Sequence, residues 1–120
     1  MRVWYLRTSD DGSSHLEQGD LGFAPVEDVA PGGVFAVAGL GTRDAGIVRF
    51  EPGFRCDFHN SPTATWMLFM QGQMEIEVSE GVTHVFGPGD AIEFHDATGR
   101  GHRSQVVGDT AVVAATAGFG

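Results

Sequence analysis

Two histidines that lie far apart in the chain, His59 and His102, are the residues best placed for chemistry. His59 ends the segment 54–59, in which apolar residues at even positions alternate with polar residues at odd positions. His102 follows a glycine-rich stretch and begins a second segment, 102–107. Imidazole exchanges a proton near neutral pH and also binds metal ions. Two imidazoles in one cavity could therefore act as general acid and general base, or could hold a metal ion.

The period of a β-strand predicts which side chains accompany His59. Successive side chains of a strand point to opposite faces, so an inward His59 places Arg55 and Asp57 inward too. We interpret Asp57 as a third catalytic residue, and Arg55 as a group that keeps Asp57 ionised and binds a substrate carboxylate or carbonyl. The alternative is that both lie on a solvent face and form an ion pair of little energetic value. The other predicted substrate-binding residues are Ser61, Thr65, Met67, Phe69, Ser104 and, at the rim, His95.

Short strands are the elements that must position these residues. Glycine makes up 18 of the 120 residues and recurs about every ten positions, which is typical of strands joined by tight turns and not of helices. We predict loop plus a short strand over 15–30 and a turn over 41–46. Trp66, Leu68 and Met70 should lie on an outer face. Roughly ten strands are predicted, at 1–7, 34–40, 47–50, 54–59, 65–71, 74–78, 82–86, 91–95, 102–107 and 111–116.

The spacing of five residues resembles a motif of the cupin superfamily. Gly53, His59, Ser61, Thr65 and Gly72 fit the spacing of the first cupin motif, G-x5-H-x-H-x3-E-x6-G. A turn at 87–90 followed by a strand, a loop and His102 resembles the second motif. The region 47–116 resembles a small single-domain cupin, which is well over half of the chain, and we interpret 1–120 as one domain of this kind. The resemblance implies an all-β fold, a jelly-roll barrel or sandwich of antiparallel strands.

The same resemblance draws attention to an incomplete set of metal ligands. Cupins hold a divalent metal with three histidines and one glutamate, whereas this chain has Ser61 and Thr65 at two of those four positions. Neutral hydroxyls are poor ligands for such ions. His59 and His102 are the only candidates that match the motifs, and a carboxylate would have to come from Asp57 or Asp96. No cofactor is favoured, and a weakly bound divalent transition metal is the alternative.

Three functions are compatible with this pattern. The first is a metal-independent cupin enzyme that uses His59 and His102, with Asp57, for isomerisation, cyclisation or elimination on a small carbonyl compound. The second is a binding protein for a small molecule that performs no chemistry. The third is a metal enzyme, such as a dioxygenase, with a degenerate ligand set. We favour the first of these.

Composition limits the partners. The chain carries 7 basic residues, all arginine, against 16 acidic ones, for a net charge of −9. This charge disfavours binding to nucleic acid or to an anionic membrane. A single cysteine, Cys56, allows no intramolecular disulfide, and we interpret it as a small buried hydrophobic residue. We expect a cytoplasmic location, a small-molecule ligand and a homodimer formed through the outer positions Trp66 and Leu68.

Overall fold

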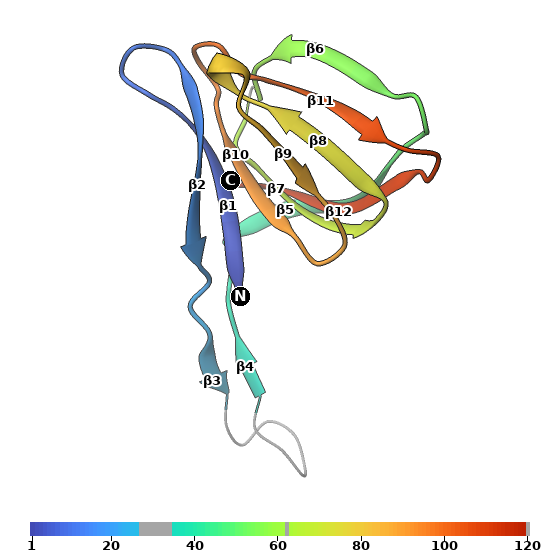
Figure 1. The fold of residues 1–120 in the computed structure, drawn as a ribbon. Helices are drawn as coiled ribbons and strands as arrows, with labels where there is room; N and C mark the ends of the chain where they lie inside the picture. Colours follow the sequence, from blue (N-terminus) through green and yellow to red (C-terminus); the bar gives the residue numbers. More distant parts are fainter. Residues whose placement is uncertain (27–34, 62, 120) are drawn as a thin grey trace.

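The computed structural model describes residues 1–26, 35–61 and 63–119. Strands account for almost all of its regular structure (Figure 1). None of the described residues belongs to a helix long and apolar enough to cross a membrane. The elements, in chain order, are β1 (Arg2–Thr8), β2 (Ser14–Asp20), β3 (Ala24–Val26), β4 (Phe35–Val37), β5 (Thr42–Phe50), β6 (Arg55–His59), β7 (Thr65–Gln71), β8 (Gln73–Glu77), the 3-10 turn η1 (Ser79–Gly81), β9 (Thr83–Phe86), β10 (Ala91–His95), β11 (His102–Val107) and β12 (Val112–Phe119).

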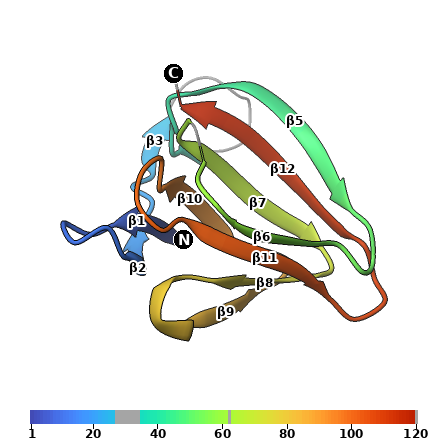
Figure 2. The same cartoon turned by 90° about the horizontal axis from the view of Figure 1, so that it is seen from above.

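These strands form two facing sheets and a small third one. The larger sheet has the order β2-β1-β10-β7-β12-β5, and the four-stranded sheet has the order β6-β11-β8-β9. The view from above shows the two sheets facing each other (Figure 2). β3 and β4 pair only with each other and extend away from the body of the molecule (Figure 1). The pairs are antiparallel except for β1 with β10, which is parallel. The predicted all-β jelly roll is confirmed.

The core lies between the two sheets. Met74, Ile76 and Val78 are buried, while Glu75 and Glu77 between them are half-exposed, as the period of two predicts. The other buried core residues come from both sheets and include Leu6, Phe69, Phe86, Ile92, Phe94, Val106, Val112 and Ala114. The apolar alternation of the sequence is therefore the pattern that holds the sheets together.

Two stretches differ from the prediction. Residues 14–20 form a full strand, β2, and residues 42–46 belong to β5 where a turn was predicted. Both strands are at the edges of the larger sheet, where few side chains reach the core and the apolar alternation is weak. Residues 27–30 of the predicted stretch 15–30, and residue 34 of the predicted strand 34–40, lie outside the described residues.

A bulge in β6 changes which side chains face the interior. His102 of β11 is opposite His59, but Ser104 is opposite Cys56, so two steps along β11 match three steps along β6. The extra residue reverses the alternation between the two pairings. As a result, Cys56 and His59 both face the space between the sheets.

Candidate functional site

A cavity of about 180 Å³ lies between the sheets. Its lining combines aromatic and sulfur-containing walls with a few polar groups. The lining residues are Phe50, Phe54, Cys56, His59, Ser61, Thr65, Met67, Phe69, Met74, Ile76, Phe94, His102 and Ser104. Of the predicted site residues, seven line this cavity: His59, His102, Ser61, Thr65, Met67, Phe69 and Ser104.

Strand register arranges these groups from a polar end to an apolar end. His59 is paired with His102 at one end, and Cys56 is paired with Ser104 about two residues further along. Beyond them, the main-chain N–H of Val106 donates to the carbonyl of Phe54. The far end is apolar, because Phe54 there contacts Phe50 at a ring-centroid distance of 4.9 Å. A ligand in this cavity therefore has a polar environment at one end only.

His102 is the buried histidine of the site. Its side chain is 5% exposed, and its Nδ1 lies 2.6 Å from Oδ2 of Asp96, whose side chain is fully buried. The ring also packs against Phe94 at 4.8 Å. The carboxylate accepts the Nδ1 proton and so fixes the orientation of the ring, which leaves Nε2 as the nitrogen available to a ligand.

His59 is the exposed histidine of the site. It lines the cavity and is also in contact with solvent, so it lies at the rim. Its Nδ1 donates to the main-chain oxygen of Asp57 at 2.9 Å and lies 3.7 Å from Sγ of Cys56. Its ring centroid is 4.5 Å from that of His102. The two imidazoles thus meet at the polar end, each with Nδ1 engaged and Nε2 available.

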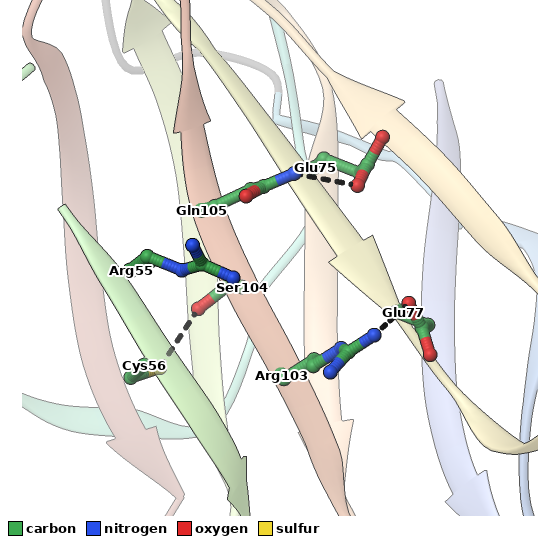
Figure 3. Close-up of a pocket in the computed structure, with 7 residues that line it drawn as sticks. All are labelled: Arg55, Cys56, Glu75, Glu77, Arg103, Ser104 and Gln105. Atoms are coloured by element: carbon green, nitrogen blue, oxygen red, sulfur yellow. Dashed lines mark hydrogen bonds and ion pairs between the residues drawn. The ribbon is translucent and has the colours of Figure 1, made fainter. Parts of the chain in front are cut away.

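The predicted placement of Arg55 and Asp57 was wrong. Both are exposed, and the hydrogen bond that Asp57 accepts within the described residues is a local one, from the main-chain N–H of Phe58 at 2.8 Å. Arg55 lines a separate polar pocket, where Arg103 pairs with Glu77 at 2.9 Å (Figure 3). The bulge in β6 is the physical reason, because it puts His59 and Cys56 on the inner face and leaves Arg55 and Asp57 on the outer one.

His95 also lies outside the cavity. Its neighbour Phe94 faces the interior, so His95 points to the outer face of the larger sheet. There its Nε2 lies 3.0 Å from Oε1 of Glu93, and its ring is stacked between Tyr5 and Phe119. The predicted role of His95 at the rim of the pocket was therefore wrong.

Sequence reasoning missed two polar contributions and much of the wall. Asp96 was considered only as a metal ligand, and Cys56 only as a packing residue. Cys56 instead lies 3.3 Å from Oγ of Ser104, inside the cavity. Asp96 directly follows β10 and alternates with the outward His95, a signal that could have been read from the strand period. The wall residues Phe50, Phe54, Met74, Ile76 and Phe94 could not be assigned to one cavity without the sheet order.

Comparison with known proteins identifies the fold. No family model and no curated protein matches the sequence. Among solved structures, a cupin-like protein of Thermotoga maritima superimposes with a TM-score of 0.53 and 20% identity. The cupin domain of Schizosaccharomyces pombe Cnp3 has a TM-score of 0.53 and 16% identity, and the match covers 98% of this chain and 81% of that one. The chain has the cupin fold.

The matches to two bacterial proteins cover a smaller part of the solved protein. A Cupin 2 conserved barrel domain protein of Salinispora arenicola has a TM-score of 0.51 and 18% identity. That match covers 63% of this chain and 61% of the Salinispora protein. The match to the Thermotoga protein covers 65% of this chain and 56% of that protein. At these identities the likeness concerns architecture. The chemistry must be argued from the residues of this chain.

The residues of this cavity do not fit the metal site that the resemblance to cupins implies. In the part of the chain that the structure describes, no three His, Cys, Asp or Glu side chains are grouped to hold a metal ion. Asp57 lies outside the cavity, and Asp96 contacts Nδ1 of His102 instead of a position near Nε2. Thr65 donates its hydroxyl to the carbonyl of Thr63 at 3.1 Å. The alternative of a metal site built from His59, His102 and one of these carboxylates is therefore not supported by the geometry.

Proposed function

We propose that this cupin is an acid–base enzyme that moves protons on a small carbonyl compound bound between His59 and His102. The observation that carries the proposal is the buried His102–Asp96 pair, 2.6 Å apart, facing a second imidazole at 4.5 Å. A carboxylate behind one imidazole stabilises the protonated ring without taking the proton itself. This favours His102 as the base and leaves His59 as the acid. Asp96 replaces Asp57 in the predicted catalytic group.

The proposed step conserves protons and electrons. His102 Nε2 takes a proton from the carbon next to the carbonyl, and the pair of the broken C–H bond forms a C=C bond. The carbonyl π electrons move to oxygen, which takes the Nε2 proton of a protonated His59. The products are an enol, a protonated His102 paired with Asp96, and a neutral His59. Return of the proton to another carbon gives isomerisation, and departure of a leaving group gives elimination.

The walls of the cavity support this chemistry. Phe94 packs against the His102 ring, and Phe69 is 1% exposed. Water therefore has little access to the part of the cavity around His102. Exclusion of water strengthens the electrostatic interactions of the imidazoles with the carbonyl oxygen and with Asp96. The exposed edge of His59 at the rim lets that ring exchange protons with solvent between turnovers.

Solvent deuterium exchange tests the proposal without knowledge of the natural substrate. Acetophenone and cyclohexanone are incubated with the protein in D2O, and loss of the protons next to the carbonyl is followed by NMR. We expect exchange faster than in buffer for at least one ketone, and a loss of about 100-fold in His102→Gln, within the range of general acid–base catalysis. His84→Gln is the matched control, because His84 packs against Trp4, at 4.3 Å, and does not line the cavity.

Two results would overturn this function. One is exchange no faster than in buffer for ketones that bind in the cavity, which would favour a binding protein without chemistry. The other is full exchange in His102→Gln.

A further inference from the structure

The cavity lining carries no formally charged side chain other than the two histidines. Of the described residues that form it, none is Asp, Glu, Lys or Arg. Asp96 lies behind His102 and is bonded to it. A ligand ammonium would enter this cavity with no counter-ion, and an anion would meet only His59, which lies at the solvent-exposed rim where its charge is screened, so burying either charge is costly. The lining therefore selects an uncharged ligand, in a protein whose net charge is −9.

The shape and composition of the walls favour a flat ring. Phenyl side chains line the cavity from three strands of the larger sheet and from the β5–β6 connection: Phe50, Phe69 and Phe94, and Phe54. Met67 and Met74 add sulfur atoms, which make favourable contacts with aromatic rings. The volume of about 180 Å³ is close to that of engineered apolar cavities of about 150 Å³ that bind benzene. One six-membered ring with a short substituent matches this space.

The polarity of the cavity fixes the orientation of such a ring. His59, His102, Ser61 and Thr65 belong to the polar end, and Phe50 and Phe54 to the apolar end. An oxygen on the ligand accepts a hydrogen bond from imidazole at the first end, and the ring packs against the phenyl groups at the second. The same orientation brings the atoms next to a carbonyl close to the two Nε2 positions.

We propose that the ligand of this cavity is an uncharged aromatic compound of one ring, with a single carbonyl-type group held at the His59–His102 end. This inference deepens the proposed function and rests on the same cavity. It is independent of proton transfer, because it concerns which molecules bind.

Isosteric probes test each part of the inference. Acetophenone is compared with benzoate and benzamidinium, which have nearly the same shape but carry a charge. Cyclohexyl methyl ketone removes the aromatic ring, and isopropylbenzene removes the polar group. Dissociation constants come from chemical-shift titrations of the ¹⁵N-labelled protein. We expect acetophenone to bind about 10- to 100-fold more tightly than either charged isostere, and more tightly than the other two probes.

A blocking variant locates the binding. Cys56→Leu adds volume in the middle of the cavity, whereas Arg55→Leu, the neighbouring position on the outer face of the same strand, does not. We expect Cys56→Leu to abolish acetophenone binding and Arg55→Leu to keep it. If Cys56→Leu does not fold, the shift changes in the wild-type protein must map to Met67, Phe69 and Phe94.

The outcomes separate this inference from the proposed function. Equal or tighter binding of benzoate, benzamidinium or cyclohexyl methyl ketone would overturn the ligand class while leaving ketone exchange possible. Shift changes that map away from the cavity would overturn it as well. Tight binding of acetophenone together with a lack of exchange would support the ligand class and overturn the catalytic function.

Discussion

Two histidine–carboxylate pairs lie close together in the chain, and the face of the sheet decides what each can do. The His102–Asp96 pair faces inward, with side chains 5% and 0% exposed, and the His95–Glu93 pair faces outward, with side chains 29% and 13% exposed. Solvent screens the outer pair, so it contributes little beyond local packing. In the inner pair, one carboxylate oxygen binds His102 and the other has no hydrogen-bond partner among the described residues. A buried carboxylate with one free oxygen is costly, and the hydrogen bond that it accepts from His102 Nδ1 offsets part of that cost.

The charge of Asp96 is therefore the property to remove. Asp96→Asn keeps the size of the side chain but no longer stabilises the protonated imidazole or selects its tautomer. We expect ketone exchange to slow by about 10- to 1000-fold, with acetophenone affinity within about threefold of wild type. Glu93→Gln, which makes the same change in the outer pair, should keep the wild-type rate. An unchanged pH profile of exchange in Asp96→Asn would contradict this positioning role.

At the level of elements, the sequence predicted the strands but not the bulge in β6. The apolar alternation in 74–78 and the glycine turns give most strands their correct places, because burial on one face imposes a period of two. The rule fails between Cys56 and His59, where one inserted residue reverses the faces. Nothing in the segment 54–59 distinguishes a bulged strand from a regular one. Asp57 and Arg55 were misplaced for this reason alone.

The loop that brings His102 against His59 depends on a glycine. Gly101 has a φ of +75°, and a Cβ there would collide with the main-chain oxygen of His59. Gly53 has a φ of +89° but nothing within 4 Å of the corresponding position. Gly53→Ala should therefore cost only the left-handed backbone, about 1–2 kcal/mol. Gly101→Ala should cost that and a steric term of about 1–3 kcal/mol more.

Urea unfolding of both glycine variants measures this difference. Similar unfolding free energies for Gly101→Ala and Gly53→Ala would show that the close approach of residue 101 to His59 is not a determinant of stability. We also expect Gly101→Ala to slow ketone exchange, because His59 must move to make room, and Gly53→Ala to leave the rate unchanged.

For the whole molecule, the spacing of the motif residues predicted the fold but not which side chains line the cavity. Gly53 and Gly72 stand at the expected turns, each with a positive φ, so the spacing predicted the architecture correctly. The ligand positions of the first motif also predicted that His59, Ser61 and Thr65 share one cavity. The aromatic walls come from three strands, β5, β7 and β10, and from the β5–β6 connection, and only the order of the strands in the sheet brings them together. Chain-level patterns therefore specify the barrel, and three-dimensional register specifies the cavity.

The outer face of the larger sheet carries an uncharged groove. It is lined by Ile47, which is 64% exposed, by Trp66 and Leu40, and by small residues of β5 and β12, and none of these described lining residues is charged. Exposed Met70 lies on the same strand as Trp66. Two copies of a chain with a net charge of −9 can meet at such a surface without placing like charges in direct contact. We expect a homodimer through this face.

Light scattering at micromolar concentration tests this expectation. Wild-type protein should show twice the chain mass of 12.7 kDa, and Ile47→Glu should show the mass of one chain, because it places a charge in the apolar contact. Val85→Glu makes the same change at another exposed apolar position, on β9 of the other sheet, and should remain dimeric. A monomeric wild-type protein would exclude the dimer. If Val85→Glu were monomeric and Ile47→Glu still dimeric, the interface would lie on the four-stranded sheet, because a buried charge disrupts only the surface on which it lies.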